Sequence, residues 1–168
     1  GCQACVVKCK EANGMPPDTG TPRGAMYDAP DDLNAKTKNI IKLYKGEDGR
    51  TSFMKAQCMH CVDPVCMIGC PTGAIHRSAG GGQVLINDDT CIGCATCANS
   101  CPYDNIRMVE IRDRTGQFIR DESTQQPIRK ATKCDLCLDQ PGGPACQRAC
   151  PHDALARVDL RDLPGLAE

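Results

Sequence analysis

The chain has 168 residues with a formal net charge of −1, no tryptophan, two phenylalanines and three tyrosines. Its 15 cysteines contribute to the 40% hydrophobic content, so few other apolar side chains remain to build a core. There is no basic run with interleaved aromatic residues, as in nucleic-acid-binding chains, and no apolar stretch long enough to span a membrane.

The cysteines fall into four sets along the chain, and proline follows the last cysteine of three of them. In chain order the sets are Cys2, Cys5, Cys9; Cys58, Cys61, Cys66, Cys70; Cys91, Cys94, Cys97, Cys101; and Cys134, Cys137, Cys146, Cys150. The third set reads C-x2-C-x2-C-x3-C-P, which is typical of thiolate ligands of [4Fe-4S] clusters. We therefore predict that all fifteen cysteines bind iron.

The first set is one cysteine short of this pattern. Cys2, Cys5 and Cys9 match its last three positions, and the first position would lie before Gly1. We expect a sixteenth ligand on a preceding segment, which would complete four [4Fe-4S] clusters. A signal peptide would lie on the same preceding segment and is not assessed from these residues. The alternative is a three-cysteine site, with a [3Fe-4S] cluster or a cubane that has a non-cysteine ligand.

Disulfides and zinc are the other uses of many cysteines. The regular short spacing and the repeated Cys-Pro ending argue against disulfides. Paired C-x2-C units also bind zinc, but a zinc site has no need of four closely spaced cysteines three times over.

Because clusters would replace side chains as the centre of the fold, we expect that the apo chain does not fold stably.

The expected secondary structure is short and irregular. Cys-Pro, a polar turn and an aliphatic residue recur at Cys70, Cys101 and Cys150, where proline would turn the backbone around a cluster. Short helices are expected around the last cysteine of each set. Strands are expected over residues 39–44, 84–86 and 107–112, the last continued through a turn at 113–116 into a returning arm at 117–120.

Two segments without cysteine, 13–57 and 107–129, are rich in proline, glycine and charge. We expect them to be insertions that dock a partner, with insulation of the clusters from water as the alternative.

In ferredoxins with two clusters, the cysteine before proline ligates the other cluster of the pair. Applied to neighbouring sets, this rule joins Cys101 to Cys58, Cys61 and Cys66, and joins Cys70 to Cys91, Cys94 and Cys97. The first and fourth sets then pair, so Cys9 joins Cys134, Cys137 and Cys146, while Cys2, Cys5 and Cys150 share a cluster with the missing cysteine. The predicted fold class is α+β, with one ferredoxin-like unit at 58–106 and another formed by 1–12 plus 130–158.

Three motifs carry a family resemblance: Cys-Met-His-Cys-Val-Asp-Pro at 58–64, Cys-Pro-Thr-Gly-Ala at 70–74 and Lys-Cys-Asp-Leu-Cys at 133–137. The chain resembles, over about residues 1–158, the four-cluster iron–sulfur subunits of molybdopterin oxidoreductases of the dimethyl sulfoxide reductase, formate dehydrogenase and polysulfide reductase types. Similar chains serve hydrogenases. The eight-residue spacing between Cys137 and Cys146 is shorter than expected for many members.

The resemblance implies a non-catalytic subunit that relays single electrons between a molybdopterin- or hydrogenase-type subunit and a second carrier or membrane subunit. It also implies a place at the cytoplasmic or periplasmic face of a membrane complex, with the cytoplasmic face favoured. No nucleophile–base pair or phosphate-binding glycine loop argues for catalysis in this chain. The alternatives are a redox-sensing module of a multidomain protein and a free polyferredoxin.

Two polar residues beside the cysteines are weaker candidates. Lys133, with Arg129 and Lys130 before it, would stabilise a reduced cluster or form a solvated basic turn. His60 would hydrogen-bond a sulfur or face solvent.

Overall fold

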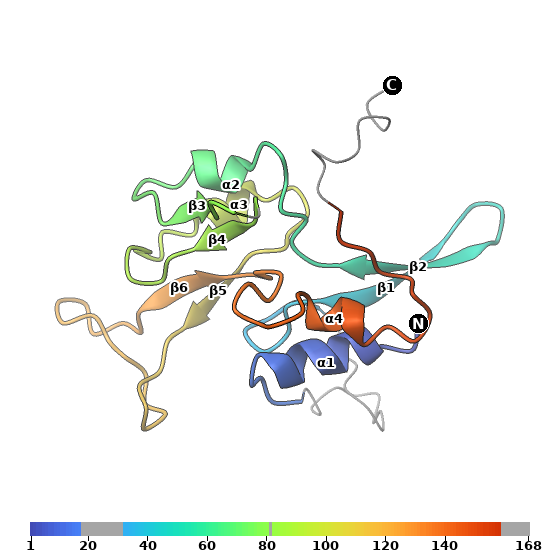
Figure 1. Ribbon diagram of the computed structural model, residues 1–168. Helices are drawn as coiled ribbons and strands as arrows, with labels where there is room; N and C mark the ends of the chain where they lie inside the picture. Colours follow the sequence, from blue (N-terminus) through green and yellow to red (C-terminus); the bar gives the residue numbers. More distant parts are fainter. Residues whose placement is uncertain (18–31, 81, 159–168) are drawn as a thin grey trace.

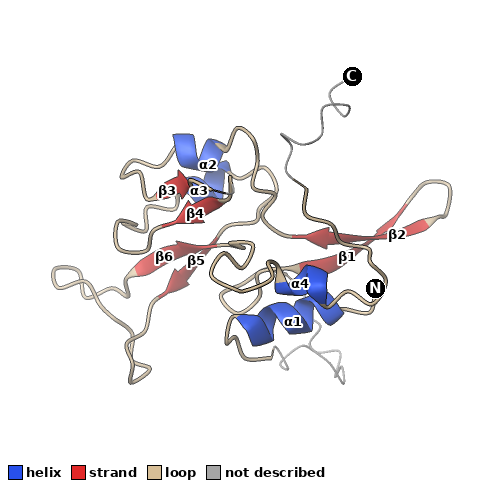
Figure 2. Cartoon of the chain, viewed as in Figure 1, coloured by secondary structure: helices blue, strands red, loops and turns tan. Residues whose placement is uncertain are grey.

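The computed structural model describes residues 1–17, 32–80 and 82–158 (Figure 1). In this part of the chain, short helices and short antiparallel strands are joined by long loops (Figure 2). The helices are α1 (Ala4–Ala12), α2 (Val65–Ile68), α3 (Thr96–Ser100) and α4 (Ala145–Arg148). The strands are β1 (Ile40–Lys45), β2 (Thr51–Ala56), β3 (Ile75–Arg77), β4 (Val84–Ile86), β5 (Arg107–Glu110) and β6 (Arg129–Thr132). This α+β arrangement agrees with a ferredoxin-like fold.

In the three Cys-Pro sets, each helix ends before the last cysteine. The sequence had predicted helices around that cysteine. α3 ends at Ser100, and Cys101 is extended with φ −73° and ψ 113°. α2 and α4 likewise end before Cys70 and Cys150. Proline disfavours helical geometry in the residue before it, so each Cys-Pro pair stops its helix. α1 has no proline after its last cysteine and continues through Cys9 to Ala12.

The strands form three antiparallel pairs: β1 with β2, β3 with β4, and β5 with β6. The predicted strands at 39–44 and 84–86 correspond to β1 and β4, and the one at 107–112 is shorter, as β5. The predicted turn at 113–116 and return arm at 117–120 form a short irregular hairpin, in which the Asp113 N–H donates to the Gln117 carbonyl. The strand β5 itself pairs with Arg129–Thr132, which was not predicted. The arm contributes single bridges, such as Arg112 with Phe118. β5 pairs with β6 and not with residues 117–120 because Ala131 of β6 is buried in the core.

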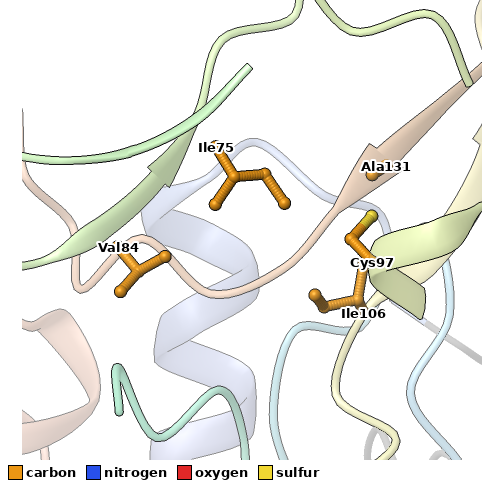
Figure 3. Packing of buried hydrophobic residues seen from close by; sticks show 5 residues of the cluster. All are labelled: Ile75, Val84, Cys97, Ile106 and Ala131. Atoms are coloured by element: carbon orange, nitrogen blue, oxygen red, sulfur yellow. The ribbon is translucent and has the colours of Figure 1, made fainter. Parts of the chain in front are cut away.

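The main core joins residues from two of the three strand pairs, β3–β4 and β5–β6, near α3 (Figure 3). It consists of Ile75, Val84, Cys97, Ile106 and Ala131. A second, smaller cluster contains Cys5, Val6 and Cys146, with Ile41 and Leu155 packed against it. Cysteines belong to both clusters, so the apolar interior is built around the sulfur atoms.

Two helix pairs connect the cysteine sets. α2 packs on α3, and α1 packs on α4 (Figure 1). The second set therefore lies beside the third, and the first set lies beside the fourth, although more than a hundred residues separate α1 from α4. The base of the β1–β2 hairpin lies beside α1 and α4, where Ile41 packs against Cys5 and Cys146, and its turn extends away from them (Figure 1).

Candidate iron–sulfur centres

One cavity is lined by cysteines from two sets. Its wall includes Cys70 from the second set together with Cys91, Cys94 and Cys97 from the third. Ile75, Ile86, Met108 and Ala131 supply apolar walls. We call these four cysteines group A, and they are the combination expected when the cysteine before proline crosses to the neighbouring set.

Cys66 and Cys58 of the second set interact electrostatically with each other and Cys66 also with Cys101 of the third. We call these three cysteines, with Cys61 of the second set, group B. Burial raises the pKa of Cys66, the negative charges of Cys58 and Cys101 add to this effect, and Lys133 opposes it. Cys66 therefore lies within electrostatic range of both thiols. The loop carrying Cys61 is held by Arg77, whose Nη2 donates to the Cys61 carbonyl at 2.6 Å.

Group C comprises Cys9 from α1 and Cys134, Cys137 and Cys146 from the fourth set, all of them buried. Burial raises the pKa of Cys9 to about 12, and the charges of the other three cysteines contribute in the same direction. Burial also raises the pKa of Cys134 to about 11. Four buried sulfurs whose thiolate charges repel one another form a site that a multivalent positive metal core would stabilise.

Group D is the remaining set, Cys2, Cys5 and Cys150. Cys5 is buried, whereas Cys2 is exposed and Cys150 is half-buried. The sulfur of Cys150 accepts a hydrogen bond from the Ala154 N–H at 3.4 Å. In the described part of the chain, no hydrogen bond joins Cys2 or Cys150 to Cys5.

Neighbouring groups adjoin one another. Burial is the largest cause of the raised pKa of three cysteines, and a sulfur from another group adds to each. The pairs are Cys97 with Cys66, Cys134 with Cys58, and Cys5 with Cys146. These electrostatic interactions place A within range of B, B within range of C, and C within range of D.

The Cys-Pro turns share one backbone geometry. The third residue after each of these cysteines is left-handed: Gly73 (φ 66°), Asp104 (φ 52°) and Asp153 (φ 48°). The next amide then reaches back to the sulfur, as Asn105 N–H does to Cys101 at 3.5 Å. The repeat seen in the sequence is thus a repeated N–H···S turn.

The loops before the helices also contain left-handed residues. They are His60, Gly93 and Leu136 inside the C-x2-C pairs, and Gln3 and Ala95 directly after Cys2 and Cys94. Gln3 and Ala95 are the left-handed N-caps of α1 and α3. The backbone after Cys2 therefore resembles the backbone after Cys94, the second cysteine of the third set. Alternating right- and left-handed residues turn N–H groups inward and form concavities that suit an iron–sulfur cluster, whose net charge with its four thiolates is negative. The residues present therefore fit [4Fe-4S] clusters.

Only Gly93 among these loop residues carries a sequence signal for the left-handed conformation. A Cβ at Gly93 would lie 2.1 Å from the Arg129 carbonyl oxygen, so the loop of group A rests directly on β6. The other four positions are not glycine, and their conformation was not predictable from residue type.

His60 is half-buried and Lys133 is buried, and both bind Val84. His60 Nδ1 accepts from the Val84 N–H at 3.0 Å, and Nε2 has no hydrogen-bond partner among the described residues. Desolvation, followed by the charge of Lys133, lowers the pKa of His60 to about 4. Lys133 Nζ donates to the carbonyls of Val84 and, at 3.0 Å, Cys134. Lys133 is thus no solvated turn residue, and His60 neither faces solvent nor reaches a thiol.

Neither a mononuclear metal site nor a membrane span is found among the described residues. No three His, Cys, Asp or Glu side chains are arranged there to hold a single metal ion. A cubane core spaces its thiolates more widely than a single ion does, so this absence bears on mononuclear sites alone. No helix in the described ranges has the length and apolar character needed to cross a membrane.

Residues 50–160 match the family described as a 4Fe-4S dicluster domain. The chain belongs to this family. It is therefore an iron–sulfur protein of the [4Fe-4S] type, and the resemblance noted from the cysteine motifs is confirmed.

Several curated relatives align with most of the chain. Hydrogenase-2 operon protein HybA of Escherichia coli O157:H7 is 31% identical over 145 residues, covering 82% of this chain and 39% of the relative. A sulfite dehydrogenase subunit of Allochromatium vinosum is 32% identical over 149 residues, covering 83% and 52%. The nitrate-inducible formate dehydrogenase iron–sulfur subunit of Escherichia coli is 35% identical over 144 residues, covering 83% and 43%. The chain thus spans about half or less of the length of these relatives.

Proposed function

We propose that this chain is a non-catalytic electron-transfer subunit with four [4Fe-4S] clusters, ligated by groups A to D and by one further cysteine before Gly1. The observation that carries this proposal is the cavity lined by Cys70 together with Cys91, Cys94 and Cys97. Ligands from different sets around one cavity are the hallmark of paired cubanes, because three neighbouring cysteines cover one face of a cluster and the fourth comes from elsewhere.

The clusters would lie in two ferredoxin-like units. Residues 58–106 would hold groups A and B, and residues 1–12 with 130–158 would hold groups C and D. The packing of α2 on α3 and of α1 on α4 supports this division.

The proximity of sulfurs in neighbouring groups supports the order A, B, C, D. When bound, [4Fe-4S] clusters supply one-electron oxidation and reduction. The chain would hold the thiolates, donate N–H groups to their sulfurs and exclude water from group C, whose cysteines are all buried. A single file of this kind suits transfer between two partners at opposite ends.

The partners would be a molybdopterin- or hydrogenase-type catalytic subunit and a second carrier or membrane subunit. Relatives named as subunits of formate and sulfite dehydrogenases support this choice. The insertions 13–57 and 107–129 would dock these partners. On the β1–β2 hairpin, Leu43 and Phe53 are directly opposite one another and are 60% and 61% exposed, which supports a buried role in a complex. The complex would lie at a membrane face, the cytoplasmic one being favoured.

Iron and acid-labile sulfide should be counted on the holo protein with its complete N-terminal segment, followed by EPR during stepwise reduction. We expect about sixteen of each per chain and spin-coupled signals from neighbouring cubanes. A single oxygen-labile cluster would favour a redox sensor instead. Four clusters in a chain that copurifies with no other subunit would favour a free polyferredoxin. Zinc without iron or sulfide would overturn the proposal.

A further inference from the structure

The β1–β2 hairpin places a lysine against a cysteine far away in the sequence. Lys55 of β2 is opposite Ile41 of β1, and both side chains are on the same face of the hairpin. Ile41 packs against the cluster of Cys5, Val6 and Cys146. The same face therefore brings the Lys55 ammonium to group C, where Nζ donates to Cys146 Sγ at 3.1 Å.

A second acceptor fixes the direction of the lysine side chain. Lys55 Nζ also donates to Gln57 Oε1, and this amide oxygen is 4.0 Å from Cys134 Sγ. No carboxylate forms an ion pair with Lys55 among the described residues. The half-buried ammonium is therefore directed at sulfur with its charge unneutralised.

The field of this ammonium extends over two groups of thiols. Burial raises the pKa of Cys9 and Cys134 in group C and of Cys5 in group D, and the positive charge of Lys55 lowers the pKa of each of them. Lys133 and Lys130 differ in kind, because their Nζ atoms donate to backbone carbonyls. Lys55 contacts a sulfur, where added electron density would accumulate.

We propose that Lys55 raises the reduction potential of the cluster held by group C, by donating a charge-assisted hydrogen bond to Cys146 Sγ. Reduction adds one negative charge to a cluster and its thiolates, so a nearby cation stabilises the reduced state more than the oxidised one. A hydrogen bond to a ligand sulfur acts in the same direction. This inference rests on the proposed function, since it requires a cluster at group C.

The test is a redox titration of the holo protein followed by EPR. Lys55→Met should lower the midpoint potential of one cluster the most, shift the other clusters less and keep iron and sulfide unchanged. Lys55→Arg, which retains charge and donors, should stay near the wild-type potential. Lys45→Met is the matched control, because Lys45 is exposed on the same face of the same hairpin and should shift nothing.

A Cys9→Ser background assigns the affected cluster. Changing a ligand of group C alters that centre, so adding Lys55→Met should produce only the smaller shifts in the remaining clusters. If Lys55→Met fails to assemble, Lys55→Gln is titrated instead, and a downward shift is again expected. If Lys55→Met or Lys55→Gln keeps all clusters and their potentials are unchanged, Lys55 does not raise the potential. That result would not affect the proposed function. Failure to find four clusters in the wild-type protein would overturn the proposed function itself.

Discussion

Cys101 belongs to the third set by sequence, yet its charge acts on Cys66 of the second. The adjacent cavity contains the reciprocal arrangement, in which Cys70 of the second set lies with three cysteines of the third. The backbone turn after Cys101 supports this placement, because the Asn105 N–H donates to its sulfur and the Asn105 side chain donates to the Gln57 carbonyl beside Cys58.

We predict that Cys101→Ser perturbs the cluster of group B and spares that of group A. The serine oxygen is a poorer ligand for iron than a thiolate, so the affected centre should be lost or its EPR signal altered. Reference spectra come from Cys61→Ser for group B and Cys94→Ser for group A. The Cys101→Ser spectrum should match that of Cys61→Ser. A match to Cys94→Ser would refute crossed ligation.

Gly93 combines a left-handed backbone (φ 73°) with close approach to Arg129 of β6. We predict that Gly93→Ala displaces β6 from the loop of group A and lowers both iron content and melting temperature. Gly73→Ala is the control, since Gly73 also has positive φ (66°) but no atom within 4 Å of an added Cβ. Backbone strain alone costs about 1–3 kcal/mol in either variant. Equal melting temperatures for the two variants would show that the contact with Arg129 is unimportant.

Arg107, the first residue of β5, connects an insertion to a cysteine turn. Its Nε donates to the Leu33 carbonyl at 2.9 Å, and its Nη2 pairs with Asp32 at 2.9 Å. Its Nη1 also donates to the Asp104 carbonyl at 2.7 Å, in the turn that follows Cys101. One guanidinium thus holds residues 32–38 against group B.

We predict that Arg107→Met releases this insertion while the clusters remain. Losing the charged hydrogen bonds should cost on the order of 2 kcal/mol, because the Leu33 and Asp104 carbonyls lose their donor. Hydrogen exchange should accelerate in residues 32–38 and change little in β3 and β4. Arg112→Met serves as control, because the exposed Arg112 stacks on Phe118 at 3.6 Å, away from residues 32–38. Unchanged exchange in residues 32–38 would contradict the prediction.

For the whole molecule, the apolar interior is small and shares its side chains with the cysteine groups. The second cluster has Val6 as its only fully apolar buried member beside Cys5 and Cys146. Without iron, the buried thiols of group C would remain as poorly packed polar atoms. Folding free energy must then come largely from the clusters.

We predict that removing iron with a chelator under reducing conditions abolishes cooperative thermal unfolding. Circular dichroism and amide hydrogen exchange should show loss of the short strands, and reconstitution with iron and sulfide should restore both. The control is the same treatment of holo protein without chelator. A compact apo chain with a sharp melting transition would show that the apolar clusters suffice.

The number of cysteines, the type of cluster and the family were readable from the sequence, because ligand spacing around a [4Fe-4S] core is local along the chain. The Cys-Pro repeat likewise anticipated three related turns. The bounds of β1 and β4 were predicted to within a residue because both lie between clear turn signals.

Other features depend on contacts between distant segments, and only the tertiary structure decided them. The pairing of β5 with β6 follows from burial of Ala131, and the burial of Lys133 follows from its carbonyl partners. Lys55 is close to the second cysteine set in sequence but contacts Cys146 of the fourth, because strand alternation directs its side chain toward α4. A spacing pattern records which residues are ligands, whereas packing determines which neighbours surround them.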